Sequence, residues 1–183
     1  MRIKILLLFL VTSCFSSAQN AINSSTRKFI DNAAVTRIVK DWNVVANIKS
    51  GTGETVSFFP IEITDLKTGQ IVKALQMDMS VDCQNFKLYK SSWVDLDEIS
   101  EFVIFLENYV IPKLSKKTEK NKSITYVFKS KEITVRFMIG DFTNRLSIYP
   151  KDEKGVDGQC YFWTETQIDK SQELLTVLQT LKQ

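Results

Sequence analysis

Apolar and polar residues alternate with a period of two in many short segments of this chain. In the clearest segment the apolar positions are Ile133, Val135, Phe137 and Ile139. Such alternation places one kind of residue on each face of an extended strand, and it predicts half-buried strands of antiparallel sheets. The predicted strands cover residues 38–48, 55–64, 71–81, 86–94, 124–128, 133–139, 145–149 and 159–166.

The segment 55–64 changes phase at Phe58-Phe59-Pro60, where residues of both parities are apolar. Proline also removes a backbone donor from the strand ladder. This combination predicts a bulge or an edge strand at these residues.

A helix is predicted directly after residue 94. The sequence Asp95-Leu96-Asp97-Glu98 has the carboxylate and the N3 glutamate of a capping box, with Asp95 as the cap. Apolar residues then recur at helical spacing until Pro112, and only Glu101, Glu107 and Asn108 are expected to face water. A second, amphipathic helix is predicted to begin near Asp169 or Ser171.

The fold class predicted from these elements is α+β, with antiparallel sheets and two helices. The regions 36–115 and 122–183 each contain four predicted strands followed by a helix, and a tandem ββββα duplication is one interpretation of this order. The order resembles the Whirly-type fold of proteins that bind single-stranded nucleic acids, although no motif residues carry that resemblance. The Ser17-Ala18-Gln19 junction and the passage from residue 93 to 99 resemble small secreted proteins of unknown function from Bacteroidota.

The first residues have the layout of a signal peptide, with a basic head, an apolar run and small residues ending at Ala18. Residues 1–18 are therefore predicted to be removed, 19–35 to form a flexible lead-in or a short helix, and 36–183 to form a single globular domain. In the alternative interpretation, Cys14 follows a lipobox and anchors a membrane lipoprotein. Beyond the signal peptide, no stretch is apolar enough to predict an integral membrane segment. The expected location is secreted or periplasmic, or membrane-anchored in the lipoprotein alternative.

The charge balance of the chain is close to neutral, with 24 lysines and arginines against 21 aspartates and glutamates. Its basic cluster, between Lys113 and Lys122, carries no interleaved aromatic residues for base stacking. It is interpreted as a solvated loop, and a patch for an anionic ligand is the alternative. Nucleic acid is therefore not expected as a partner. The expected partner is an unknown protein or a small ligand.

Cys83 and Cys160 are the cysteines that remain after the predicted signal peptide. Two cysteines in an oxidising compartment form a disulfide or stay as buried thiols, and the sequence leaves both alternatives open. Neither has a second cysteine at metal-ligand spacing, which excludes a CxxC redox pair and a cysteine zinc cluster.

The chain contains no histidine, and this excludes every mechanism that needs one. Its glycines never reach the spacing of a phosphate-binding loop, so nucleotide hydrolysis is not expected. The carboxylates of Asp95, Asp97 and Glu98 are close enough in sequence to share a cation, but helix capping is the favoured interpretation. No cofactor is predicted.

Aromatic residues supply the candidate ligand-binding positions, which are Trp93, Tyr161 and Trp163. Core packing is the competing interpretation for them. The favoured function class is a binding or interaction module of unknown ligand. A histidine-free hydrolase that uses two facing carboxylates is one alternative, and a structural or inhibitor-like partner protein with an exposed apolar patch is another.

Overall fold

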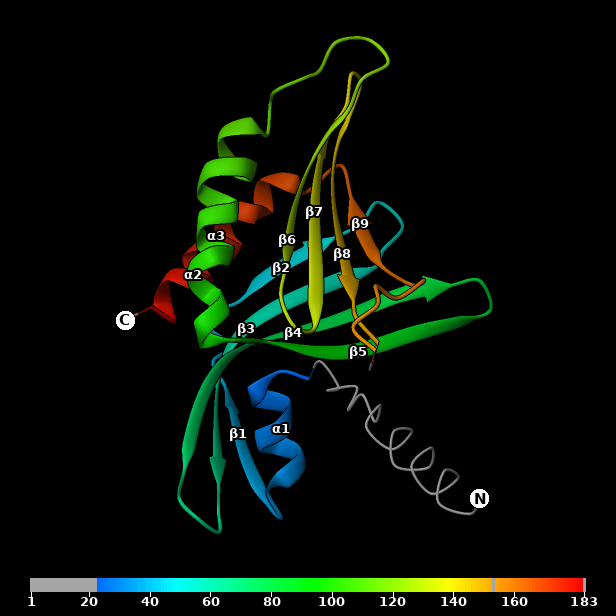
Figure 1. Cartoon of the computed structure of the whole chain (residues 1–183). Helices are drawn as coiled ribbons and strands as arrows, with labels where there is room; N and C mark the ends of the chain where they lie inside the picture. The colour runs from blue at the N-terminus through cyan, green and yellow to red at the C-terminus, as the bar shows by residue number, and fades with distance from the viewer. Residues whose placement is uncertain (1–22, 153, 183) are drawn as a thin grey trace, which may run out of the picture.

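Two antiparallel sheets, of five and four strands, and three α-helices build the α+β fold that the sequence predicts (Figure 1). The structure is a computed structural model that describes residues 23–152 and 154–182. The predicted signal peptide, Cys14 and the start of the predicted lead-in lie outside these residues. No helix in the described part of the chain is both long and apolar enough to cross a membrane.

The first sheet is an antiparallel meander whose outer strand is interrupted. Its strands are β1 (Thr36–Lys40), β2 (Ala46–Lys49), β3 (Thr55–Asp65), β4 (Ile71–Cys83) and β5 (Phe86–Asp95). β1 and β2 both pair with β3, β1 along its second half and β2 along its first half. The strand predicted over 38–48 is therefore two strands, separated by residues 41–45.

The interruption lies opposite the phase change that the sequence shows. β3 pairs with β4 on its other side, so it is an internal strand and the expected edge strand is wrong. Phe59 and Pro60 have no paired residue in β1 or β2, although the Pro60 carbonyl accepts a hydrogen bond from the Asp41 amide at 3.5 Å. Phe58 belongs to the main core, whereas Phe59 belongs to a second, smaller cluster. Both parities are apolar here because β3 buries both of its faces.

The second sheet is an uninterrupted meander in the order β6 (Ile124–Lys129), β7 (Ile133–Ile139), β8 (Asn144–Pro150) and β9 (Phe162–Thr164). β9 is shorter than the predicted strand 159–166. In Figure 1 this sheet stands across the strands of the first sheet, and the main core lies between them.

The two predicted helices close one side of this core. α2 (Leu96–Phe105) continues through a π-helical turn, Leu106–Val110, and a 3-10 turn, Ile111–Lys113. Ile104 is exposed, contrary to the expectation that only polar residues of this helix face water. α3 (Ser171–Thr180) follows a short 3-10 turn, Ile168–Lys170. Each sheet is thus followed in the chain by one of these helices.

A third helix, α1 (Ser25–Asn32), forms inside the predicted lead-in and selects the short-helix alternative there. It contacts β4 and β5 and lies beside the part of the first sheet that contains β1 (Figure 1). Phe29 and Ile30 pack against the smaller cluster of Phe59, Ile61 and Ile63, among others. Hydrogen bonds and an ion pair also hold α1 on the protein.

Candidate functional site

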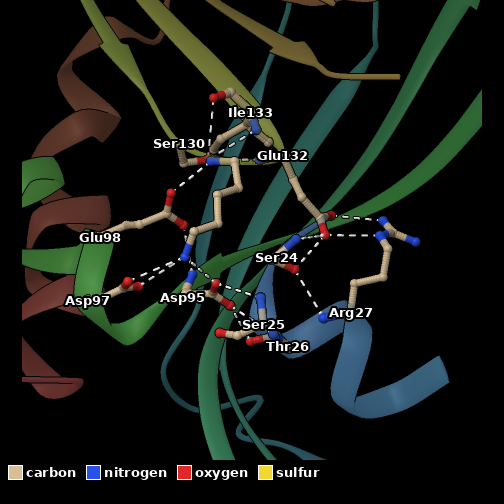
Figure 2. A network of polar contacts seen from close by, with 11 residues as sticks. Ser24, Ser25, Thr26, Arg27, Asp95, Asp97, Glu98, Ser130, Glu132 and Ile133 are labelled. Atoms are coloured by element: carbon tan, nitrogen blue, oxygen red, sulfur yellow. Dashed lines mark hydrogen bonds and ion pairs between the residues drawn. The ribbon is translucent and has the colours of Figure 1, made fainter. Parts of the chain in front are cut away.

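Asp95 connects three elements at the end of β5 (Figure 2). It is the N-cap residue of α2, and Glu98 accepts a hydrogen bond from its amide at 3.1 Å, as the capping box predicts. Its own carboxylate accepts hydrogen bonds from the amides of Ser25 (2.7 Å) and Thr26 (3.0 Å) and from the Thr26 hydroxyl (2.7 Å). Asp95 therefore also caps the first turn of α1, which the sequence did not indicate.

Lys131 supplies the cation of this cluster. Its Nζ lies 2.8 Å from Asp95 Oδ2 and 3.3 Å from Asp97 Oδ2. Its backbone amide donates to Glu98 Oε1 at 2.7 Å. Ligand atoms of Asp95, Asp97 and Glu98 do lie within 4.8 Å of one another, as a metal site requires. The ammonium group of Lys131 already balances part of their charge, so the capping interpretation explains the trio without a metal.

These contacts shift the pKa values of the cluster in opposite directions. Burial alone raises the pKa of Asp95, but hydrogen bonds from Lys131, Thr26 and Ser25 outweigh it and lower the pKa to about 2. Burial raises the pKa of Glu98, and its hydrogen bonds only partly oppose this effect. Hydrogen bonding to Asp95 raises the pKa of Lys131. Asp95 and Lys131 are thus held in their charged forms.

Glu132 is a second buried carboxylate of this network, and sequence reasoning missed it. It accepts hydrogen bonds from the Ser24 hydroxyl at 2.5 Å, from Arg27 Nε at 2.9 Å and Nη2 at 2.8 Å, and from the Trp93 amide at 3.1 Å. Its partners come from α1 and β5, which are far from it in sequence, so no local pattern identifies it.

Trp93, one of the aromatic candidates, is a residue of β5 and lies next to Glu132, where β5 meets α1. The Arg27 guanidinium sits 4.5 Å from the centre of its ring. Its indole nitrogen is buried and has no hydrogen-bond partner among the described residues. The structure therefore places Trp93 under α1 and apart from Tyr161 and Trp163.

Cys83 and Cys160 form a disulfide, which is one of the two alternatives that the sequence leaves open. Cys83 is the last residue of β4, and Cys160 precedes β9. The bond thereby links the first sheet to the chain that enters the last strand of the second.

A pocket of about 380 Å³ lies beside this disulfide. Its lining combines three aromatic rings, three amides and two carboxylates with the cystine itself. The side chains are Phe86, Tyr161, Trp163, Gln84, Asn85, Gln159, Glu54 and Asp82. Two of the three aromatic candidates thus meet in one pocket, and among the described residues no lysine or arginine lines it.

The order of residues at the start of β9 explains how the rings of Tyr161 and Trp163 reach the pocket. Phe162 is fully buried in the core, so its neighbours Tyr161 and Trp163 point to the other side. Tyr161 stacks on Tyr149 with ring centres 4.3 Å apart, and Arg145 lies 4.5 Å from the centre of the Trp163 ring. These contacts hold both rings in place.

The two acids of the pocket differ in exposure. Glu54 is buried, and its carboxylate accepts hydrogen bonds from the Asp82 amide at 3.1 Å and from the Thr52 hydroxyl at 3.2 Å. Asp82 is exposed, and its nearest ion-pair partner, Lys87, is 3.9 Å away. Sequence reasoning missed both acids and the three amides, because they lie in or next to turns without periodic patterning.

No protein-family model, curated protein or solved structure matches this chain. The functional interpretation therefore depends on the geometry of its own residues.

Proposed function

We propose that this protein is a secreted or periplasmic binding module whose pocket beside the Cys83–Cys160 disulfide takes a small neutral saccharide. The observation that carries the proposal is the lining of the pocket, in which Phe86, Tyr161 and Trp163 surround the same volume as three amide side chains.

The chemistry of a sugar matches these groups. Its ring presents C–H faces that pack against the electron-rich faces of aromatic rings. Its hydroxyls both donate and accept hydrogen bonds, as the amides of Gln84, Asn85 and Gln159 do. The carboxylates of Glu54 and Asp82 add further acceptors. The volume is in the range of small-molecule sites.

The charge of the lining narrows the ligand class. Glu54 and Asp82 are both acidic, and no basic residue lines the pocket in the described part of the chain. These carboxylates would repel an anionic ligand, and no cation of the lining itself opposes that repulsion. A neutral saccharide is therefore favoured over uronic acids, phosphates or sulfated sugars.

The disulfide supports the proposed secreted or periplasmic location. Disulfides persist in oxidising compartments outside the cytoplasm. The signal peptide predicted over residues 1–18 and the alternative lipid anchor at Cys14 both lead to such a compartment.

Isothermal titration with neutral di- to tetrasaccharides, and with uronic-acid oligomers for comparison, tests the proposal. We expect binding of a neutral oligomer that weakens at least about tenfold in Trp163→Ala. Trp42→Ala is the matched control, because Trp42 is an exposed tryptophan outside the pocket. Equal loss in both variants, or binding only of acidic oligomers, contradicts the proposal.

A carboxylate-based hydrolase is the second candidate, because Glu54 and Asp82 share the same pocket. Retaining and inverting glycosidases both need two carboxylates around the scissile bond. The release of new reducing ends from a bound oligosaccharide, and its loss in Asp82→Asn, would favour this candidate over simple binding.

A further inference from the structure

β6 is an edge strand of the second sheet. Its only strand partner in the described part of the chain is β7. The other edge of β6 presents unpaired backbone groups along six residues, Ile124–Lys129. Such an edge is a template for an additional strand.

An apolar groove of about 400 Å³ runs between this strand and the helix beside it. Six of its eight lining residues are apolar or aromatic, and Glu101 and Lys129 are the two charged ones. The apolar and aromatic residues are Ile104, Phe105 and Tyr109 from the helical side and Tyr126, Val127 and Phe128 from the strand. Ile104, Tyr109 and Val127 are exposed. Tyr109 lies on the π-helical turn that follows α2, and such turns are frequent at functional sites.

The other described edge strands lack this combination. β9 has only three residues, and the outer strand formed by β1 and β2 is interrupted. Lysines discourage pairing at an edge. β5 carries two of them, Lys87 and Lys90, in its first half, whereas β6 carries one, Lys129, as its last residue. β6 combines an unpaired backbone edge with an apolar groove at its side.

One end of the groove is positively charged. Lys113 Nζ lies 4.9 Å from the ring centre of Tyr126 and 5.2 Å from that of Tyr109. The loop that follows adds Lys116, Lys117, Lys120 and Lys122, against a single acidic residue, Glu119.

We propose that the groove binds an extended acidic peptide of a partner protein, which pairs with β6 as an added strand. Alternate apolar side chains of the peptide enter the groove, and its carboxylates face Lys113. This site is separate from the saccharide pocket and does not depend on it. A second copy of the chain fits less well, because antiparallel pairing of two β6 strands would place Lys129 of each copy at the lysine-rich end of the other.

The test is a titration of the ¹⁵N-labelled protein with a defined ten-residue probe peptide, two aspartates followed by alternating valine and threonine. We expect saturable shifts at residues 101–109 and 124–129. Ile104→Asp and Lys113→Glu should each weaken binding about tenfold. Tyr89→Ala is the matched control on the β5 edge, and it should leave binding unchanged.

Two altered probes identify the mode of binding. Replacing the aspartates with lysines should abolish binding to the unmodified protein and restore it in Lys113→Glu. Replacing the threonines with prolines should abolish binding, because proline cannot donate to a strand ladder. Three results would each overturn the proposal. The aspartate probe does not bind, the proline probe binds as tightly as the threonine probe, or the protein forms a dimer through this groove.

Discussion

The protein holds two groups of carboxylates in contrasting surroundings. Asp95 and Glu132 point into the protein, where amides and hydroxyls of α1, together with Lys131 and Arg27, donate to them. Glu54 and Asp82 line an open pocket with aromatic rings and amides. The sequence drew attention to Asp95 of the first group, whereas Asp82 of the second group is exposed and leaves a surface for a ligand.

The difference teaches what each group does. α1 buries Thr26 but none of its apolar residues completely, whereas α3 buries Leu174, Val177 and Leu178. The carboxylates of Asp95 and Glu132 therefore replace part of the apolar burial that would otherwise hold α1 on the protein. Of the two pocket acids, Glu54 accepts hydrogen bonds from the Asp82 amide and the Thr52 hydroxyl. The carboxylate of Asp82 is exposed, and ligand binding is expected there.

The largest expected effect concerns the disulfide that borders the pocket. Replacing both Cys83 and Cys160 with alanine should lower the free energy of unfolding by about 3 to 5 kcal/mol, because the bond closes a long loop in the unfolded chain. Chemical denaturation measures this loss. Saccharide binding should fall as well, whereas an unchanged affinity would show that the pocket forms without the bond.

Glu132→Ala should lower the free energy of unfolding by about 3 kcal/mol, since it leaves buried donors of Ser24 and Trp93 without their acceptor. Glu101→Ala, at an exposed helical position, is the control and should change the free energy of unfolding by less than about 0.5 kcal/mol. Comparable losses in the two variants would contradict the structural role assigned to Glu132.

The lowered pKa of Asp95 predicts that the stability of the fold depends on pH. Its pKa falls from 3.8 to about 2 on folding, so its stabilising contribution is present above the unfolded value and is lost as the pH falls towards 2. The loss should be about 2 kcal/mol. Urea unfolding between pH 5 and 2 should give the same slope in the unmodified protein and in Asp31→Asn, the control on the exposed surface of α1. The slope should be shallower in Asp95→Asn, where the lowered pKa values of Asp65 and Asp78 still contribute to it.

The smallest expected effect is that of divalent cations. Because Lys131 already lies against Asp95 and Asp97, calcium, magnesium or manganese should leave the melting temperature unchanged. A concentration-dependent increase that disappears in Asp97→Asn would restore the metal interpretation of this cluster.

Local patterns predicted most of the strands and two helices, because alternation and helical spacing are visible within a few residues. The gap between β1 and β2 was not predicted, since it depends on β3 burying Phe58 and Phe59 on opposite faces. Glu132 and Glu54 were missed for a related reason. Each acquires its partners only when distant segments come together, and single residues in turns carry no periodic signal.

The most direct test of the account compares two tryptophans. In ¹H–¹⁵N spectra of the protein titrated with a neutral oligosaccharide, the indole signal of Trp163 should shift and saturate, while that of Trp93, beneath Arg27, stays constant. A saturating shift of Trp93 with no change at Trp163 would contradict the account and return the ligand site to the cluster around Asp95.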